Sequence, residues 1–354
     1  MTDNRDFDTL TPEVRLRVDE EDFPLDAQAD LVSVSVLEDV NATGMFTFTL
    51  LCWDGQEMRV TWIDDDRFKE GNSVEIHMGY LDNIEALFSG EITGLEPEFP
   101  REQPPTLTVR GYDRRHRLMG RRKTRTFLNM TDSDIANQIA GEWSLSPEVE
   151  DTGVTLDYVL QHNRTDFEFL RERAQRIGYE FLVTDTNLQF RPRQNEGSAA
   201  ITLRREVELL DFSARLTTIG QHEEVFVQGW SPRDKEELVA HAAAGDERAM
   251  GSASGPAQVR DVFGGTADTS VEMPVLNQAE ADQLVDGWFA EMALRYVEGQ
   301  GVCIGRPDLR AGTLVEIEGL GRRFSGSYYV TSTEHSFKPS AGYHTAFTVR
   351  RNAT

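Results

Sequence analysis

The sequence predicts a mainly β protein, with two similar antiparallel β-barrel domains and a small helical α+β domain between them. Short segments in which apolar and polar residues alternate recur over residues 1–112 and again over residues 199–354. This period of two is typical of strands that bury one face. Residues 113–198 instead carry helical patterns with capping signals and a hairpin pattern. The 354 residues are enough for three domains of this kind.

The first domain is predicted to consist of strands in quick succession. Residues 1–10 are polar and acidic and predict no ordered element. Val, Ile, Leu or Phe then alternates with Ser, Thr or charged residues, without a helical period between the segments. Such a set favours an antiparallel sandwich or barrel. The expected strands lie at about residues 14–18, 32–36, 46–50, 73–80, 86–95 and 106–112.

Two helices are expected in the middle domain, because each begins with a capping signal. Thr131 is a candidate N-cap, and apolar residues follow it at helical spacing. Thr165 and Glu168 fit a capping box, and Gly178 is a typical residue at a helix end. Residues 179–192 then predict a hairpin.

The last domain begins with further strand patterns and closes with three consecutive strands over residues 312–350. Residues 231–274 are rich in Ala, Gly and Asp and predict a long irregular excursion, with a strand or two. An amphipathic helix follows, capped by Asn277 and ended by Gly299, so that the excursion and helix together span about residues 231–299. The strands expected before the excursion lie at residues 201–203, 207–212 and 224–230.

An internal repeat connects the two β domains. Residues 71–76 and 312–317 share the pattern Gly-x-x-Val-Glu-Ile, and Phe-Ser-Gly at 88–90 recurs at 324–326. Thr-Val-Arg closes both stretches, at 108–110 and 348–350. We therefore expect residues 71–112 and 312–350 to be equivalent strands of two barrels. The alternative is chance, because strands are generally rich in these residues.

Composition limits the function classes. The net charge of −25 argues against general nucleic-acid binding, which needs a positive surface. No apolar run approaches the ~20 residues of a membrane span, and the N-terminus has no signal-peptide core.

Cys52 and Cys303 stand alone and predict two buried free thiols. His335 and His344 could face each other across the last hairpin, but two ligands make a poor zinc site. No metal and no cofactor is expected.

One basic block interrupts the acidic chain. Residues 110–125 hold eight Lys or Arg and one acid, Asp113, which leaves a net charge near −32 on the rest of the chain. We expect part of this block to lie at an interface with an acidic partner or a sister subunit. The alternative is a solvated linker whose cations pair with nearby acids. The candidate interface residues are Arg114, Arg115, Arg117, Arg121, Arg122, Lys123 and Arg125.

Several motifs together resemble the phage late-control protein D family, the baseplate hub proteins of contractile tails, which also includes the hub half of type VI secretion spike proteins. Each motif alone is weak, but their order matches that of the family, and together they cover about residues 112–350. The matching segments are Gly111-Tyr-Asp113 with the arginine block, Gln161-His-Asn-Arg-Thr-Asp-Phe-Glu-Phe-Leu170, Val227-Gln-Gly-Trp-Ser-Pro232, Gln278-Ala-Glu-Ala-Asp282 and Phe324-Ser-Gly-Ser-Tyr-Tyr-Val-Thr331.

The resemblance implies a structural role. Hub proteins of this family form a homotrimer, whose pseudo-sixfold ring joins a hexameric inner tube to a trimeric spike. They assemble in the cytoplasm and become part of a virion tail baseplate or an injection particle, together with other baseplate proteins. No glycine-rich β-helix repeat follows the second β domain, so we expect the spike to be a separate protein.

The sequence predicts no enzymatic activity. It contains no Gly-x-Ser-x-Gly, no His-Glu-x-x-His and no phosphate-binding glycine loop. A tail-associated peptidoglycan-degrading enzyme remains the alternative, because lytic activities accompany tail hubs. A carbohydrate- or receptor-binding β module is a third class, although its usual platform of exposed aromatic residues is not evident.

Overall fold

The first part of the chain contains all six strands expected from the alternating pattern. The computed structural model describes residues 11–81, 83–231, 233–271 and 274–354, so the expectation for residues 1–10 lies outside it. The six strands are β1 (Pro12–Val18), β3 (Leu31–Asp39), β4 (Met45–Leu51), β7 (Ser73–Tyr80), β8 (Asn83–Glu98) and β9 (Thr106–Tyr112). Shorter elements accompany them, namely β2 (Glu21–Asp22), α1 (Leu25–Ala29), β5 (Trp53–Asp54), β6 (Arg59–Val60) and the 3-10 helix η2 (Asp66–Phe68).

The middle part is a small α+β unit with more strands than expected. Both predicted helices form, and Thr131 and Thr165 each cap one of them in a complete capping box. The predicted hairpin is also present, but three strands were not foreseen. In order, the elements are the 3-10 helix η3 (Arg114–Met119), β10 (Lys123–Met130), α2 (Asp132–Glu142), β11 (Ser146–Val149), β12 (Leu156–Arg164), α3 (Asp166–Arg176), β13 (Tyr179–Thr184) and β14 (Asn187–Pro192).

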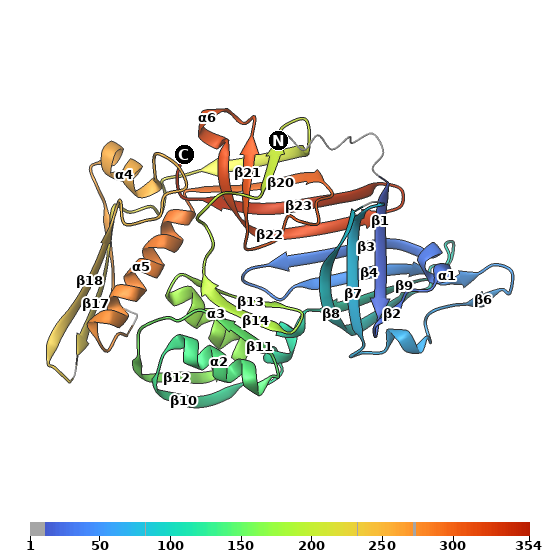
Figure 1. The fold of residues 1–354 in the computed structure, drawn as a ribbon, viewed down its shortest axis with the longest axis horizontal. Coiled ribbons are helices and arrows are strands. Elements are labelled where there is room, and N and C mark those ends of the chain that lie inside the picture. Colours follow the sequence, from blue (N-terminus) through green and yellow to red (C-terminus); the bar gives the residue numbers. More distant parts are fainter. Residues whose placement is uncertain (1–10, 82, 232, 272–273) are drawn as a thin grey trace.

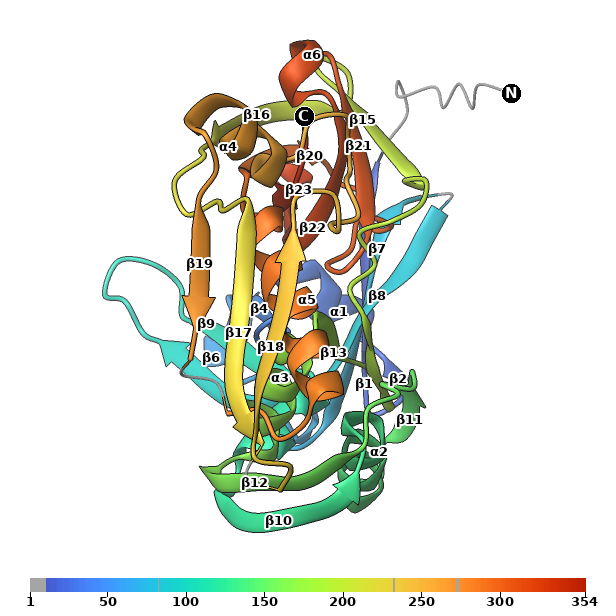
Figure 2. The same ribbon diagram turned by 90° about the vertical axis from the view of Figure 1, so that its left-hand side faces the viewer.

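In the last part, the expected excursion contains two strands, Glu236–Ala243 and Ala267–Ser270, as predicted, and also a helix, Gly255–Phe263, that was not predicted. The elements are β15 (Ile201–Arg204), β16 (Leu209–Leu216), β17 (Glu224–Ser231), β18 (Glu236–Ala243), α4 (Gly255–Phe263), β19 (Ala267–Ser270), α5 (Gln278–Leu294), β20 (Val297–Ile304), β21 (Leu314–Glu318), α6 (Gly321–Phe324), β22 (Gly326–Lys338) and β23 (Gly342–Arg351). Strands β18, β17 and β19 form a separate small sheet, and α5 lies along one of its faces (Figure 2). Asn277 caps α5 as predicted, but the helix ends at Leu294, and Gly299, the predicted stop, lies in strand β20.

One large sheet connects the two ends of the chain (Figure 1). It has 13 strands among the described residues, in the order β16-β20-β23-β22-β3-β4-β9-β8-β7-β1-β2, with β21 also paired to β22 and β15 paired to β21. The predicted fold class, mainly β with a small α+β part, is confirmed. The two sets of strands do not form separate sheets, however, because β22 pairs with β3 as well as with β23. We call this pairing of residues 332–337 with residues 34–39 the internal seam.

Two hydrophobic cores lie along this sheet, one in each set of strands. The first half, made of β1, β3, β4, β7, β8 and β9, surrounds a core that includes Phe46, Phe48 and Ile76. The second half, made of β15, β16, β20, β21, β22 and β23, surrounds a core that includes Tyr328 and Val349. Each half therefore buries its own apolar face, as the alternating sequence pattern requires.

The two halves have the same strand topology. The hydrogen-bonded order β3-β4-β9-β8-β7-β1 in the first half corresponds to β16-β20-β23-β22-β21-β15 in the second, and the order along the chain also agrees. One pairing differs in direction, since β1 runs antiparallel to β7 whereas β15 runs parallel to β21. The match of six strands in two orders supports the predicted duplication.

Two β-bulges occur at matching places in both halves and show which residues of one half correspond to which residues of the other. Val32 in β3 and Leu210 in β16 are each skipped in the pairing with the next strand. Thr93 in β8 and Thr331 in β22 are likewise skipped, in the pairing with β9 and β23 respectively. Bulges are placed specifically, so their coincidence is evidence for a common origin of the halves. If the bulges are equivalent, a residue of β3 corresponds to the residue of β16 that is 178 positions later. A residue of β8 corresponds to the residue of β22 that is 238 positions later.

These offsets correct part of the repeat found in the sequence. The offset of 238 residues makes Tyr328 the counterpart of Gly90. Val74 pairs with Gly90 and Val315 pairs with Tyr328, so the two copies of Gly-x-x-Val-Glu-Ile occupy equivalent positions. By the same offset Phe88 corresponds to Gly326, so the Phe-Ser-Gly match is wrong by two residues. The Thr-Val-Arg match is displaced by two residues as well. A displacement of two keeps each side chain on the same face of its strand, which explains why the sequence did not reveal it.

The halves also fill their cores from different strands. In the first half Phe46 pairs with Gly111, whereas the equivalent pair in the second half is Gly299 with Val349. A Cβ on Gly111 would lie 2.3 Å from the Phe46 ring, and a Cβ on Gly299 would lie 2.7 Å from the Phe212 ring. Large and small residues have thus exchanged strands, which preserves close packing while removing sequence identity.

Candidate interface residues

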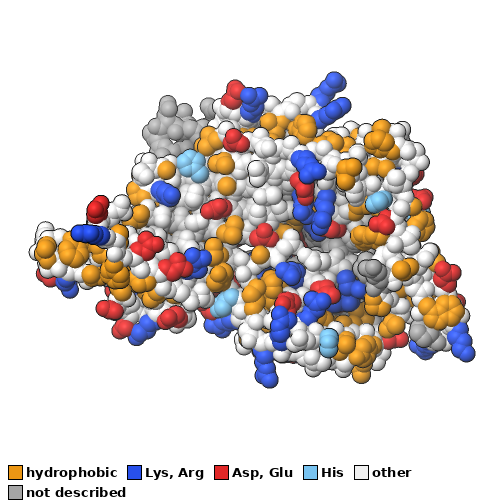
Figure 3. Space-filling view, turned by 180° about the vertical axis from the view of Figure 1, so that it is seen from behind, with side chains coloured by type: hydrophobic (Ala, Val, Ile, Leu, Met, Phe, Trp, Pro, Cys, Tyr) orange, Lys and Arg blue, Asp and Glu red, His pale blue; other side chains and the backbone are white. Residues whose placement is uncertain are grey.

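The arginine block occupies η3 and the start of β10, where the chain leaves the first half. Six of its seven predicted interface residues pair with carboxylates of the same chain, and Arg121 is the exception within the described residues. On the face seen in Figure 3, Lys and Arg side chains are interspersed with Asp and Glu rather than gathered in one patch. Much of the block therefore serves contacts within the chain, as the linker alternative implied.

Arg115 is the most buried member of the block, with 4% of its surface exposed. Its guanidinium donates to Asp113 at 2.7 and 2.9 Å and to the backbone oxygen of Asp39. Asp113 is buried too, and it also accepts from the backbone N–H groups of Arg115 and Gly44. This pair fastens the start of η3 to the first half, so Arg115 is not available to a partner.

Glu91 holds the next two arginines against β8. It is 5% exposed and accepts two hydrogen bonds from Arg117, at 2.5 and 2.7 Å. Arg114 lies 3.5 Å from the same carboxylate. Arg117 is about half exposed, so this pair is open to solvent on one side. Bidentate pairing of this kind fixes geometry better than a single lysine contact would.

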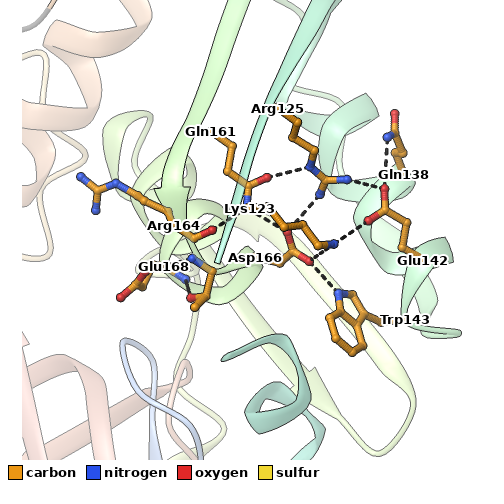
Figure 4. Close-up of polar contacts among 10 residues, drawn as sticks. Lys123, Arg125, Gln138, Glu142, Trp143, Gln161, Arg164, Asp166 and Glu168 are labelled. Carbon is orange, nitrogen blue, oxygen red and sulfur yellow. Dashed lines mark hydrogen bonds and ion pairs between the residues drawn. The ribbon is translucent and has the colours of Figure 1, made fainter. Parts of the chain in front are cut away.

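Asp166 is the centre of a second network (Figure 4). This carboxylate is fully buried at the first position of α3, and it accepts from Lys123 Nζ at 2.6 Å and from Arg125 Nη2 at 3.0 Å. Trp143 Nε1 and Gln161 Nε2 donate to it at 2.8 and 2.9 Å. Four elements, β10, β12, α2 and α3, are thereby joined at one carboxylate.

Glu142 completes this network from the end of α2. It accepts from Lys123 at 3.0 Å and from Arg125 at 2.5 Å. Burial acts to raise the pKa of Glu142, but hydrogen bonds from Arg125, Lys123 and Gln138 outweigh it, so the pKa lies below its usual value. The two cations of β10 are thus neutralised by two acids from the helices.

The exposed end of the block consists of Arg121 and Arg122. Arg122 donates to Glu168 at 2.9 and 3.0 Å, and this pair is open to solvent. Arg121 is exposed and, within the part of the chain that the structure describes, has no carboxylate at ion-pair distance. Of the predicted interface residues, Arg121 is therefore the one whose charge is free for a partner.

A cleft with a volume of about 500 Å³ lies where the two halves meet the α+β unit. Three arginines that line it are already paired, Arg115 with Asp113, Arg310 with Glu38 and Arg191 with Glu180. Burial raises the pKa of Glu180, which also accepts a hydrogen bond from Tyr329. The charges of this cleft hold its walls together.

The remaining sequence candidates behave as structural residues. Cys52 and Cys303 are buried free thiols, as predicted, and burial raises their pKa values to about 11 and about 12. His335 lies in the internal seam and bonds Tyr343 Oη at 2.8 Å. His344 pairs with Ser336 rather than with His335.

In the described ranges no group of three or more His, Cys, Asp or Glu residues could hold a metal. None of the helices described is long and apolar enough to cross a membrane.

Solved structures with this fold come from phage tails and from a secretion machine. The 43 kDa tail protein of prophage MuSo2 from Shewanella oneidensis aligns with a TM-score of 0.72 and 14% identity, over 96% of this chain and 98% of that one. A tail protein from Neisseria meningitidis gives 0.69 and 13%, over 96% of each chain. A type VI secretion component of Escherichia coli gives 0.56 and 12%, over 97% of this chain and 77% of that one. At these identities the likeness establishes the fold.

A family model gives the classification. No curated protein matches this sequence. Residues 11–338 match the model described as the Alg8 N-terminal domain, and not that of the late-control protein D family to which the motifs pointed. The match extends over the first half, the α+β unit and the second half as far as β22. The chain therefore belongs to the Alg8 N-terminal domain family.

Proposed function

We propose that this protein is a non-catalytic baseplate hub of a contractile injection system or phage tail. Three copies form a pseudo-sixfold ring that joins a hexameric inner tube to a separate trimeric spike. The observation that carries this proposal is the duplication, with six strands in the same order and two bulges in the same places. Three subunits with two equivalent halves each offer six similar surfaces, the number that a hexameric tube requires.

The fold of the solved tail proteins supports this proposal. In our reading residues 1–112 and 199–354 are the two ring domains, and residues 113–198 are the insert between them. The protein is then a hub counterpart of the late-control protein D family, assembled in the cytoplasm and carried in a virion tail or an injection particle. Its partners are the tube protein, the spike and other baseplate proteins.

The purified chain is expected to form a trimeric ring. Light scattering after size exclusion should give three times the 40.0 kDa of one chain, and negative-stain images should average to a threefold ring. Added tube protein should bind one end of the ring. A chain that remains monomeric at every concentration, or a twofold dimer, would contradict the proposed ring.

Reversal of Arg121 is expected to weaken assembly. In the proposed hub its unpaired charge faces the acidic surface of a neighbour, so Arg121→Glu should lower the trimer fraction in sedimentation at low salt. Each exposed pair contributes only about 0–1 kcal/mol, so the loss should be partial. At high salt the variant and the original protein should become alike.

Arg233→Glu is the matched control, because Arg233 is also exposed but lies outside the block. The interface role of Arg121 is wrong if both variants assemble as well as the original protein at low salt.

A further inference from the structure

Strands β8 and β16 are among the strands of the large sheet that have an open edge. Residues 94–98 of β8 pair with β9 on one side and, among the described residues, with no strand on the other. Residues 211–216 of β16 likewise pair with β20 alone. An open edge presents a row of unpaired N–H and C=O groups, which is a template for a further strand.

The chain itself contains a model of how such edges meet. By the equivalence of the halves, β8 corresponds to β22 and β16 corresponds to β3. These two counterparts pair with each other in the internal seam, antiparallel, from Ser332 opposite Asp39 to Phe337 opposite Val34. If the open edges pair in the way their counterparts do in the internal seam, β8 pairs with β16. Within one chain six strands separate β16 from β8 in the sheet order, so the partner is a second copy.

We infer that the open edge of β8 pairs antiparallel with the open edge of β16 of a neighbouring copy, with Glu96 opposite Arg215 of the partner subunit. This inference rests on the proposed ring and specifies its subunit contact. The offsets of the two bulges fix the register. Gly94 then lies opposite Thr217 of the partner subunit, and Glu98 lies opposite Ser213 of the partner subunit.

The face turned toward the cores is apolar on both edges in this register. Phe99 is 64% exposed in the single chain, although its equivalent Phe337 packs against the first core. It meets Phe212 of the partner subunit, a half-buried ring that already contacts Tyr328. The other residues of this face are Leu95 and Pro97 on β8, and Ala214 and Leu216 on β16. Pairing removes apolar surface from water on both edges.

The opposite face supplies a charge pair. Glu96 and Arg215 are both exposed, and opposite charges directly across two strands stabilise the pair. Displacing the register by two residues in one direction brings Glu98 opposite Asp211, where like charges repel. A displacement by one residue exchanges the two faces and exposes the apolar residues. A displacement by two residues in the other direction would set Glu98 opposite Arg215, so the register is taken from the internal seam, and the side chains on both edges fit it.

The contact joins two different edges, so it is head-to-tail. Such contacts build a closed ring or an open filament, but not a twofold dimer. Because each contact between subunits copies the internal seam, the halves alternate around the ring with similar spacing.

A disulfide can test the register. Directly opposite residues in antiparallel strands have Cα atoms about 4.5–5.5 Å apart, which a disulfide can bridge. The double variant Glu96→Cys with Arg215→Cys should form chains linked in pairs and in threes after mild oxidation. Cys52 and Cys303 are buried and do not compete. Glu96→Cys with Asp211→Cys is the control, since Asp211 lies on the same face of β16 but four residues away.

Exchanging the charges is the second test. Glu96→Arg alone and Arg215→Glu alone should each reduce the trimer fraction at low salt, and the two together should restore it. Glu96 also pairs with Arg110 of its own chain at 3.0 Å. A recovery in the combined variant cannot come from that contact, because Arg215 takes no part in it.

The outcomes separate this inference from the proposed function. A trimer that forms no disulfide in the matched pair, or forms it equally in the control, overturns the strand pairing and leaves the ring in place. A chain that is monomeric at every concentration overturns both. Linked trimers in the matched pair, with recovery in the charge-exchanged variant, support both.

Discussion

Replacing Asp166 with alanine is expected to destabilise residues 113–198 by about 3–5 kcal/mol, because two partly buried cations lose the buried carboxylate that neutralises them. The carboxylate is fully buried and accepts from Lys123, Arg125 and Trp143. Glu142 can balance only one of the two cations. Asp166→Asn should also destabilise, because the amide keeps the shape of the carboxylate but not its charge.

Hydrogen exchange of peptides from α2 and α3 measures this loss locally, which avoids treating the whole chain as one unfolding unit. Protection in both helices should fall in Asp166→Ala and remain unchanged in Asp157→Ala, whose carboxylate is exposed on β12. If protection in the two variants is the same, the network contributes little to the stability of this unit.

Lowering the pH is expected to lower the free energy of unfolding, because His335 in the internal seam becomes protonated. Burial lowers the pKa of His335 from 6.5 to about 4; the charge of Glu38 acts against this shift and that of Arg310 adds to it. Between these pH values the unfolded chain binds a proton that the folded chain does not, so stability falls as pH falls. A shift of this size corresponds to about 3 kcal/mol, fully lost once the pH is below about 4.

The measurement compares urea unfolding at pH 7 and pH 4.5 for the original protein and for His335→Gln, which can still bond Tyr343. The difference between the two pH values should be smaller in the variant by about 2–3 kcal/mol. His344→Gln is the control on the same hairpin. Equal pH dependence in all three proteins would mean that His335 does not titrate as its burial implies.

The sequence predicted elements that have local signals. Both capping boxes could be found because a Thr and an acid three residues later interact within one turn. The six strands of the first half could be found because one face of each is buried. Strands β10 and β12 were missed because their exposed face carries Leu128 and Tyr158, which hides the alternation. Helix α4 was missed because its Gly and Pro residues resemble a loop.

The candidate site depended on long-range contacts that the sequence does not show. The arginine block was visible as a cluster of charge, but Lys123 and its partner Asp166 are 43 residues apart. Arg115 and Asp113 are only two residues apart, but the contacts of this pair with Gly44 and Asp39 are long-range. The repeat was visible from three short matches, yet its register required the bulges at Thr93 and Thr331.

Pro97 and the acids beside it have a consequence for the newly synthesised subunit. An unpaired strand edge can pair with other chains and cause aggregation, and soluble proteins commonly prevent this by placing charged residues and proline on such edges. Pro97 removes one donor from the β8 edge, and Glu96 and Glu98 repel other acidic chains. A lone subunit is thereby protected from fibril-like association until a complementary edge arrives. Replacing Pro97 with valine, which restores the missing donor, and Glu98 with an apolar residue would be expected to strengthen pairing while sacrificing solubility.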